Sequence, residues 1–266
     1  MPSYRDLIHA FRRVELGAHS QVLLHASISS LPPIPGGAET VIGALLSTCD
    51  GLIAPAFTLR SMITPRVGPA DNALDYGQAD EQNLNAEIYS LDLPADDGPD
   101  SISETLRQHQ GALRSDHPLL SFVGVNADEA LQAQSSDEPW APIAWLAEYD
   151  ADVVLLGVDH TANVSLHYAE SKAGRRQFVR WALTPGGVVE CPDFPGCSAG
   201  FQAIASRLES VNRTAQLGEL TIEAIPLRDM INIAAGWIHE DPRALLCDRE
   251  GCPCCAAVRA SVRVDG

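Results

Sequence analysis

The apolar run DVVLLGV at residues 152–158 most restricts what this chain can fold into. A short, nearly continuous apolar run of this kind is typical of a strand that is buried on both faces of a sheet. Similar runs occupy residues 21–27 and 51–57, and segments with a helical spacing of apolar residues lie between the runs. The sequence therefore predicts an α/β fold with a mixed central sheet that is flanked by helices on both faces.

The remaining elements follow the same alternation. Apolar runs predict further strands at 121–125 and 219–225. Residues 176–191, RQFVRWAL-TPGG-VVEC, predict a hairpin, from which we expect part of the sheet to be antiparallel. The predicted helices lie at 3–16, 38–47, 102–110, 127–133, 142–149, 161–171, 199–211 and 228–238.

Residues 59–100 interrupt this alternation. They are rich in Pro, Asp, Asn and Gly and show little periodicity, so we expect one long loop. The loop carries Asp71 and Asp75, which makes it either an acidic substrate loop or a solvated surface. A chain of 266 residues is of ordinary size for one domain, and we expect a single domain over residues 1–266.

The charge balance limits the partners. Lys and Arg number 18 and Asp and Glu number 35, which gives a net charge of −17. Nucleic-acid binding needs a basic surface and is not expected, and an anionic membrane is an unfavourable partner. A cationic small molecule fits, because a cleft of one charge concentrates the opposite charge; otherwise the charge serves only solubility. No signal peptide is recognisable and no apolar run approaches the ~20 residues of a membrane span, so we expect a cytoplasmic protein, as a monomer or a homodimer.

Six of the seven cysteines follow residue 190, and a Cys-rich tail occupies residues 241–266. Cys252-x-x-Cys255 has the spacing of half a tetrahedral zinc site, and Cys247 is the expected third ligand. For the fourth ligand we favour Cys197 over Cys191. We expect a structural zinc ion that staples the tail onto the sheet; the alternative is a set of reduced thiols. A redox pair is less favoured, because the motif does not start a helix that follows a strand.

Polar side chains crowd the segment GVDHTANVSLHYAE at residues 157–170. In open α/β sheets, ligands bind at the carboxyl ends of strands. Asn163, His167 and Glu170 are spaced to share one helix face. A carboxylate beside an imidazole orients the ring and raises its basicity. The spacing alone favours a solvent-exposed His–Glu pair, and a catalytic base is the alternative.

This segment resembles G-V-G-x-D-x-N-T-S-L-H-L-A-E of the aminoglycoside 3-N-acetyltransferase (antibiotic acetyltransferase) family. Blocks at 22–46, 114–122 and 137–146 are also similar to family segments, in the same order. The resemblance covers most of residues 20–172. It implies an enzyme that transfers the acetyl group of acetyl-coenzyme A to the 3-amino group of an aminocyclitol antibiotic. The Cys-x-x-Cys ending is similar to that of apramycin-type members, which supports the zinc site.

The resemblance also implies roles for single residues. His167 is the expected general base, Glu170 its orienting carboxylate and Asp193 a catalytic residue near the acceptor amine. The acidic residues expected to bind the cationic acceptor are Asp71, Asp75, Asp137 and Asp159. Coenzyme A needs small polar groups and backbone N–H donors, which we expect at His25, Ser27, Ser29, Gly36, Gly37, Ser115 and His117.

The chain departs from the family pattern at three positions. The family's Thr is Val164, which offers no donor to an oxyanion, so Ser165, a backbone N–H or nothing takes its place. A family Ser is Ala141, and the usual Gly at the strand end is Asp159. Two alternative functions follow. One is acetylation of a different amine on the same fold, and the other is a non-catalytic, zinc-stabilised protein that binds coenzyme A or a cationic sugar.

Overall fold

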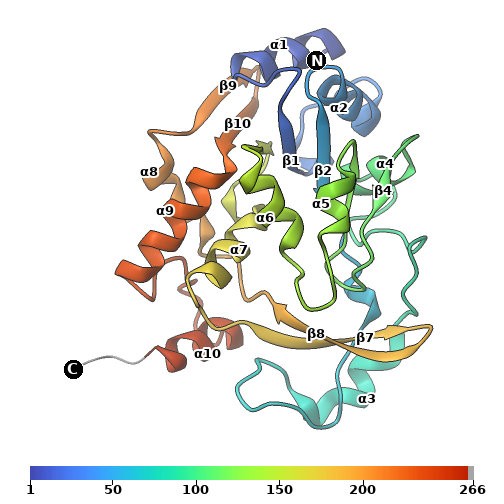
Figure 1. Cartoon of the computed structure of the whole chain (residues 1–266), viewed down its shortest axis with the longest axis vertical. Coiled ribbons are helices and arrows are strands. Elements are labelled where there is room, and N and C mark those ends of the chain that lie inside the picture. The colour runs from blue at the N-terminus through green and yellow to red at the C-terminus, as the bar shows by residue number, and fades with distance from the viewer. Residues whose placement is uncertain (263–266) are drawn as a thin grey trace.

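A seven-stranded mixed sheet forms the centre of the computed structural model, which describes residues 1–262 (Figure 1). The strands are β1 (Gln21–Ala26), β2 (Gly51–Pro55), β4 (Leu113–Arg114), β5 (Phe122–Val125), β6 (Asp152–Leu156), β9 (Arg213–Leu217) and β10 (Leu220–Pro226). Their order is β4-β5-β2-β1-β6-β10-β9. β1 is parallel to both of its neighbours, and the other neighbouring pairs are antiparallel. The predicted mixed α/β sheet is confirmed.

Helices cover both faces of this sheet, because successive side chains of a strand point to opposite faces. Val22 and Leu24 pack into one core, and Leu23 between them packs into the other. The first core is closed by α1 (Tyr4–Arg13), α2 (Gly37–Leu46) and α4 (Ile102–Gln108). The second is closed by α5 (Asp128–Gln132), α6 (Ala141–Glu148), α7 (Ser165–Lys172) and α9 (Leu227–Glu240).

The predicted hairpin forms, but it lies outside the central sheet. β7 (Phe178–Thr184) pairs with β8 (Gly187–Phe194) on one side and with the short β3 (Met62–Ile63) on the other, in a separate three-stranded sheet, seen at the foot of Figure 1. The expectation that this hairpin supplies the antiparallel part of the central sheet is therefore wrong. Most of β8 is exposed or half-buried, so the hairpin has no two apolar faces to bury between helix layers.

The 59–100 region contains only short elements, and it is tied down by polar side chains. These elements are η2 (Leu59–Ser61), β3, η3 (Tyr76–Gln78), α3 (Ala79–Gln82) and η4 (Asn83–Asn85). The amide of buried Asn72 both donates to the Val179 carbonyl and accepts from the Val179 N–H, each at 2.9 Å. Arg60 Nε donates to Asp96 at 2.8 Å. The long loop is thus fixed against β7 over part of its length.

Three other segments differ from expectation. The helix predicted at 161–171 begins only at Ser165, after the 3-10 turn η5 (His160–Ala162) that Asp159 caps. The helix predicted at 199–211 is η6 (Phe201–Ile204) followed by α8 (Ala205–Leu208). The tail contains α10 (Pro253–Ser261), and residues 263–266 of the predicted tail and domain lie outside the described residues. Across residues 1–262, no helix combines the length and apolar character that crossing a bilayer requires.

Candidate active site and cysteine cluster

The imidazole of His167 is held by a carboxylate on the same helix. Nδ1 of His167 lies 2.8 Å from Oε2 of Glu170, one turn further along α7. The other oxygen, Oε1, accepts from Nη1 of Arg175 at 2.8 Å. The His167 and Glu170 side chains are only 7% and 5% exposed, so the solvent-exposed pair that spacing alone favours is not what the chain forms. A carboxylate only accepts, so a neutral imidazole donates its N–H proton from Nδ1 to Glu170. Its lone pair is then on Nε2.

Two aromatic rings enclose this imidazole. Trp140 stacks on it with ring centroids 5.8 Å apart, and Phe201 tilts against it at 4.7 Å. Nε1 of Trp140 donates to the backbone carbonyl of Asp193 at 3.1 Å. Asp193 is largely exposed near the end of β8. The partial shielding of its carboxyl group from water raises the pKa of that group. Asp193 is therefore linked to the surroundings of His167 through Trp140.

The turn before α7 holds a buried polar network. The hydroxyl of Ser165 donates to Oδ1 of Asn163, and both residues are fully buried. The Asn163 amide nitrogen donates to His160 Nδ1 at 3.3 Å and to Met230 Sδ at 3.1 Å. The Ser165 hydroxyl proton is thus already used, so of the expected alternatives a backbone N–H, or no donor in place of the family Thr, remains.

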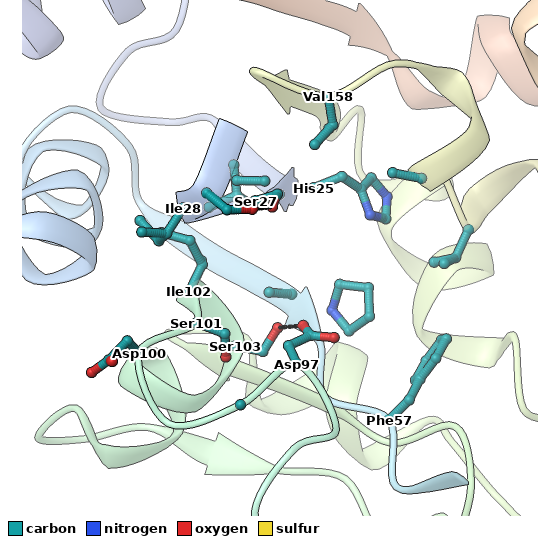
Figure 2. Close-up of a pocket in the computed structure, with 18 of the residues that line it drawn as sticks. His25, Ser27, Ile28, Phe57, Asp97, Asp100, Ser101, Ile102, Ser103 and Val158 are labelled. Atoms are coloured by element: carbon teal, nitrogen blue, oxygen red, sulfur yellow. Dashed lines mark hydrogen bonds between the residues drawn. The ribbon is translucent and has the colours of Figure 1, made fainter. Parts of the chain in front are cut away.

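A cavity of about 630 Å³ opens at the carboxyl ends of β1 and β2 (Figure 2). Three of the residues expected to hold coenzyme A, His25, Ser27 and Ser29, line it, together with Val164 and residues 97–103. Burial, and then the neighbouring His160, lower the pKa of His25 to about 3, so its imidazole is neutral. Its Nε2 is buried and has no protein partner. The parallel strands β1, β2 and β6 end on this edge of the sheet, as ligand sites in such sheets require.

The other residues expected at the donor site lie away from this cavity wall. Gly36 and Gly37 form the start of α2, both with positive φ, at 80° and 54°. The Ser115 hydroxyl accepts from Phe122 N at 2.8 Å, and Nδ1 of His117 accepts from two backbone N–H groups of the same turn. Ser115 and His117 are buried, and these bonds fix the turn that leads into β5.

The carboxylates expected to bind the acceptor are all exposed. Asp159 accepts from the Thr161 N–H at 2.9 Å, and Asp75 accepts from the Gly77 N–H at 3.0 Å, so both also cap turns. Asp71 lies in the 59–100 region and has φ 56°. Asp137 lies near β8, where burial, followed by the charges of Glu190 and Asp137, raises the pKa of Cys191 to about 12. Asp137 thus acts electrostatically on β8 and Asp193 lies near its end, whereas Asp71 and Asp75 belong to the 59–100 loop, which packs against β7.

The four cysteines predicted as metal ligands come together. The sulfur atoms of Cys197, Cys247, Cys252 and Cys255 all lie within 4.8 Å of one another. Cys191, the second choice for the fourth ligand, is fully buried in the second core and is not part of this group. Cys252 caps α10 and Cys255 lies in its first turn, while Cys197 follows β8. The cluster therefore joins two parts of the chain that are far apart in sequence, the segment after β8 and the Cys-rich tail.

Sequence reasoning missed three residues around His167. Trp140 lay inside a block that resembles the family, but nothing in its spacing tied it to the imidazole. Phe201 and Arg175 come from segments after the matching blocks. A buried arginine is rare unless it is paired, but the burial of Arg175 is not readable from the sequence, so no sequence signal pointed to it.

Comparisons with known proteins agree with this architecture. The crystal structure of aminoglycoside acetyltransferase AAC(3)-IVa, as the apoenzyme, matches with a TM-score of 0.75 at 25% identity, over 98% of each chain. A histidine-to-alanine mutant of that enzyme in complex with a gentamicin matches equally, over 98% of this chain and 97% of that one. Aminoglycoside N(3)-acetyltransferase VII of Streptomyces paromomycinus is 32% identical over 257 residues, 85% of this chain and 87% of that protein.

The fold and the relatives define the class of protein: an acyl-coenzyme-A-dependent N-acetyltransferase. The chain belongs to the aminoglycoside 3-N-acetyltransferase family, whose model matches residues 23–239. The family that the sequence blocks indicate is thereby confirmed.

Proposed function

We propose that this protein transfers the acetyl group of acetyl-coenzyme A to the 3-amino group of an aminoglycoside, within a ternary complex and with His167 as general base. The observation that carries the proposal is the 2.8 Å contact from His167 Nδ1 to Glu170 Oε2, which leaves Nε2 as the basic atom. An imidazole is suited to this work, because its unperturbed pKa of about 6.5 lies near neutral pH.

The reaction is a direct transfer. The acceptor amine passes a proton to Nε2 of His167 and attacks the thioester carbonyl carbon. The C–N bond forms and the C–S bond breaks, and the imidazolium returns its proton to the coenzyme A thiolate. The thioester oxygen carries negative charge in between. Because Val164 has no donor and the Ser165 hydroxyl is held by Asn163, we assign the oxyanion to a backbone N–H of this turn.

Each substrate has a supported place. We assign the pantetheine arm of the donor to the cavity beside Val164, which His25, Ser27 and Ser29 also line. Gly36, Gly37, Ser115 and His117 remain predictions for the rest of coenzyme A. Asp137 and Asp193 support a cationic acceptor near Trp140, and Asp159, Asp71 and Asp75 are predicted to reach its outer amines. The partner chemistry agrees with the net charge of −17.

We also propose that the cysteine cluster holds one structural zinc ion. Thiolates at ~2.3 Å from zinc in a tetrahedron lie about 3.8 Å apart, and the four sulfur atoms already lie within 4.8 Å of one another. The ion would cross-link the end of β8, the segment after α9 and the start of α10. Four protein ligands leave no open position for a substrate, so no reaction step passes through the metal.

A thiol-release assay with acetyl-coenzyme A and a panel of aminoglycosides tests the function. Release of coenzyme A with aminoglycosides, and a product acetylated at the 3-amino group, is the expected result. Turnover only with other amines would support the alternative of the same fold with a different acceptor. The observation that favours this alternative is Val164 in place of the family Thr. Binding without thiol release would leave the non-catalytic alternative.

A further inference from the structure

Arg175 closes the chain of contacts that begins at His167. The two oxygens of Glu170 are divided between them: Oε2 faces His167 and Oε1 accepts from Arg175 Nη1, each at 2.8 Å. The other terminal nitrogen of Arg175 donates to the backbone carbonyls of Pro242 and Ala244, at 3.0 and 2.6 Å. The Arg175 and Glu170 side chains are 3% and 5% exposed.

This arrangement uses the shape of a guanidinium. Arginine is a planar fork of donors, so it can hold a carboxylate with one nitrogen and two carbonyls with the other; lysine offers only a point charge. A buried carboxylate is costly without a charged partner. The first partner of Glu170, the His167 imidazole, has to be neutral before it can accept a proton, so it cannot supply that charge in the resting enzyme. A permanently charged group therefore stabilises the Glu170 carboxylate and its orientation toward Nδ1 even while the imidazole is neutral.

The contacts also reach the C-terminal part of the chain. Ala244 and Leu245 are buried in the same core as Phe201, which packs on His167. Cys247 of the cysteine cluster follows three residues after Ala244. The backbone segment whose carbonyls accept from Arg175 is thus held in place by core packing at Ala244 and Leu245 and by the cysteine cluster at Cys247.

We propose that Arg175 is a positioning residue, which fixes the Glu170 carboxylate between His167 and the carbonyls of the 242–244 segment and so sets the proton affinity and orientation of His167. The inference rests on the proposed role of His167 as base. Arg175 itself touches neither reacting group. It acts through Glu170, so its loss changes how the imidazole titrates as well as how stable the fold is.

The charged groups around the imidazole are few. Glu170 contacts it from α7, and Arg175, from the following loop, contacts the far oxygen of Glu170. Trp140 and Phe201, from the two elements packed on its faces, carry no charge, and Asp193 lies behind Trp140. In Arg175→Met, the imidazolium is the one remaining charged partner of the Glu170 carboxylate among the contacts described. The protonated form of His167 is therefore stabilised relative to the neutral form. The NMR signal of the His167 ring is then expected to titrate at higher pH than in the wild type.

The experiment compares Arg175→Met and Arg175→Lys with a matched control, Arg228→Met. Arg228 likewise donates to two backbone carbonyls, of Ala147 and Glu148, and pairs with a carboxylate, Asp150, but it does not reach His167. The first readout is the NMR pH titration of the His167 ring in the resting protein, assigned by the signal lost in His167→Gln. The second is the acid limb of kcat/KM against pH.

Three results support the inference. Arg175→Met moves the His167 midpoint and the acid limb to higher pH. Arg175→Lys folds, keeps the midpoint near that of the wild type and lowers kcat by roughly tenfold, because the amine cannot hold all three acceptors. Arg228→Met changes neither readout.

A wild-type His167 titration in folded Arg175→Met would overturn the inference. If that variant does not fold, Arg175→Lys decides: wild-type kcat with an unchanged His167 signal rejects the role. Failure of the proposed function is distinguishable, because the NMR titration needs no substrate. A protein that shows the shift and acetylates no aminoglycoside retains the Arg175 role without the proposed reaction.

Discussion

The indole of Trp140 stacks on the imidazole of His167 and, through Nε1, donates to the Asp193 carbonyl at 3.1 Å. One side chain therefore connects the central sheet's helical layer to the end of the β7–β8 hairpin. Because Trp140 is 3% exposed, it also fills space in the second core. Its ring position and its hydrogen bond are separable by substitution.

Trp140→Phe is expected to keep the stacking and lose the bond to Asp193. A net hydrogen bond contributes about 1 kcal/mol, so the loss of stability should be small. Turnover should fall several-fold, because the hairpin end that carries Asp193 is no longer fixed beside the acceptor site. Trp140→Ala adds a cavity and should cost about 3–5 kcal/mol. Denaturant unfolding and kcat/KM measured on both variants check this, and equal turnover in wild type and Trp140→Phe would contradict it.

The catalytic role of His167 predicts a large, specific loss. In His167→Ala the rate should fall by roughly 10²–10⁴, the usual contribution of general-base catalysis, with folding and acetyl-coenzyme A binding nearly unchanged. Glu170→Gln should cost less, since the base remains and only its charged partner is removed. Single-turnover rates and circular dichroism measure the two effects. His9→Ala, at an exposed histidine of α1, is the control. A folded His167→Ala protein with wild-type kcat would end this assignment and return attention to Asp137, His160 or Asp193.

The sequence was informative where local pattern decides structure. The run at 152–158 forms β6 and the two residues that follow it. The alternation of apolar runs predicted a mixed sheet with two helix layers. Pairing partners were not predictable, because a strand's neighbour depends on long-range contacts. The strands β3, β4 and β9 and the separate hairpin sheet were missed for this reason.

The same limit applies to the site. His167 and Glu170 were found because one helix turn joins them. The four-cysteine group was found because three of its members lie within nine residues of one another. Arg175, Trp140 and Phe201 meet His167 or its carboxylate from separate segments, and no spacing rule relates such positions. Tertiary packing supplied this part of the site.

The acidic surface predicts that acceptor binding weakens with salt. A polycationic sugar near Asp137, Asp193 and Asp159 is attracted electrostatically, and salt screens charges over ~10 Å at 0.1 M. KM for the aminoglycoside should therefore rise with ionic strength, while KM for acetyl-coenzyme A rises less. Asp137→Asn should raise KM at low salt and make its salt dependence shallower. A KM that stays flat across the salt series would mean that neutral hydrogen bonds dominate acceptor binding.

Glu104 predicts a defined loss of stability in acid. It is buried on α4, and burial by itself raises the pKa of its carboxyl group. Hydrogen bonds from Arg107, Gln108 and the Ala95 N–H outweigh this effect and lower the pKa to about 2. A depressed pKa in the folded state stabilises the fold above the unfolded value of 4.5, and this stability is lost as pH falls toward 2. Glu104→Gln should therefore be less stable than wild type at neutral pH, and the two curves should converge between pH 4.5 and pH 2. Denaturant unfolding at a series of pH values tests this; parallel curves would show that Glu104 does not titrate in that window.

The cysteine cluster predicts one zinc ion per chain, and the tail itself provides a matched control. Cys252 and Cys254 are two residues apart, yet only Cys252 belongs to the group whose sulfur atoms converge; Cys254 packs beside Phe178 and Val258. Metal analysis of protein purified without chelator should give about one zinc per chain for wild type and Cys254→Ser, because four thiolates complete the coordination. Cys252→Ser should bind much less zinc and melt at a lower temperature. Its folded fraction should keep most of its turnover, since the metal does not reach the reacting groups. Wild-type protein without bound zinc, or equal zinc content in Cys252→Ser and Cys254→Ser, would refute the site.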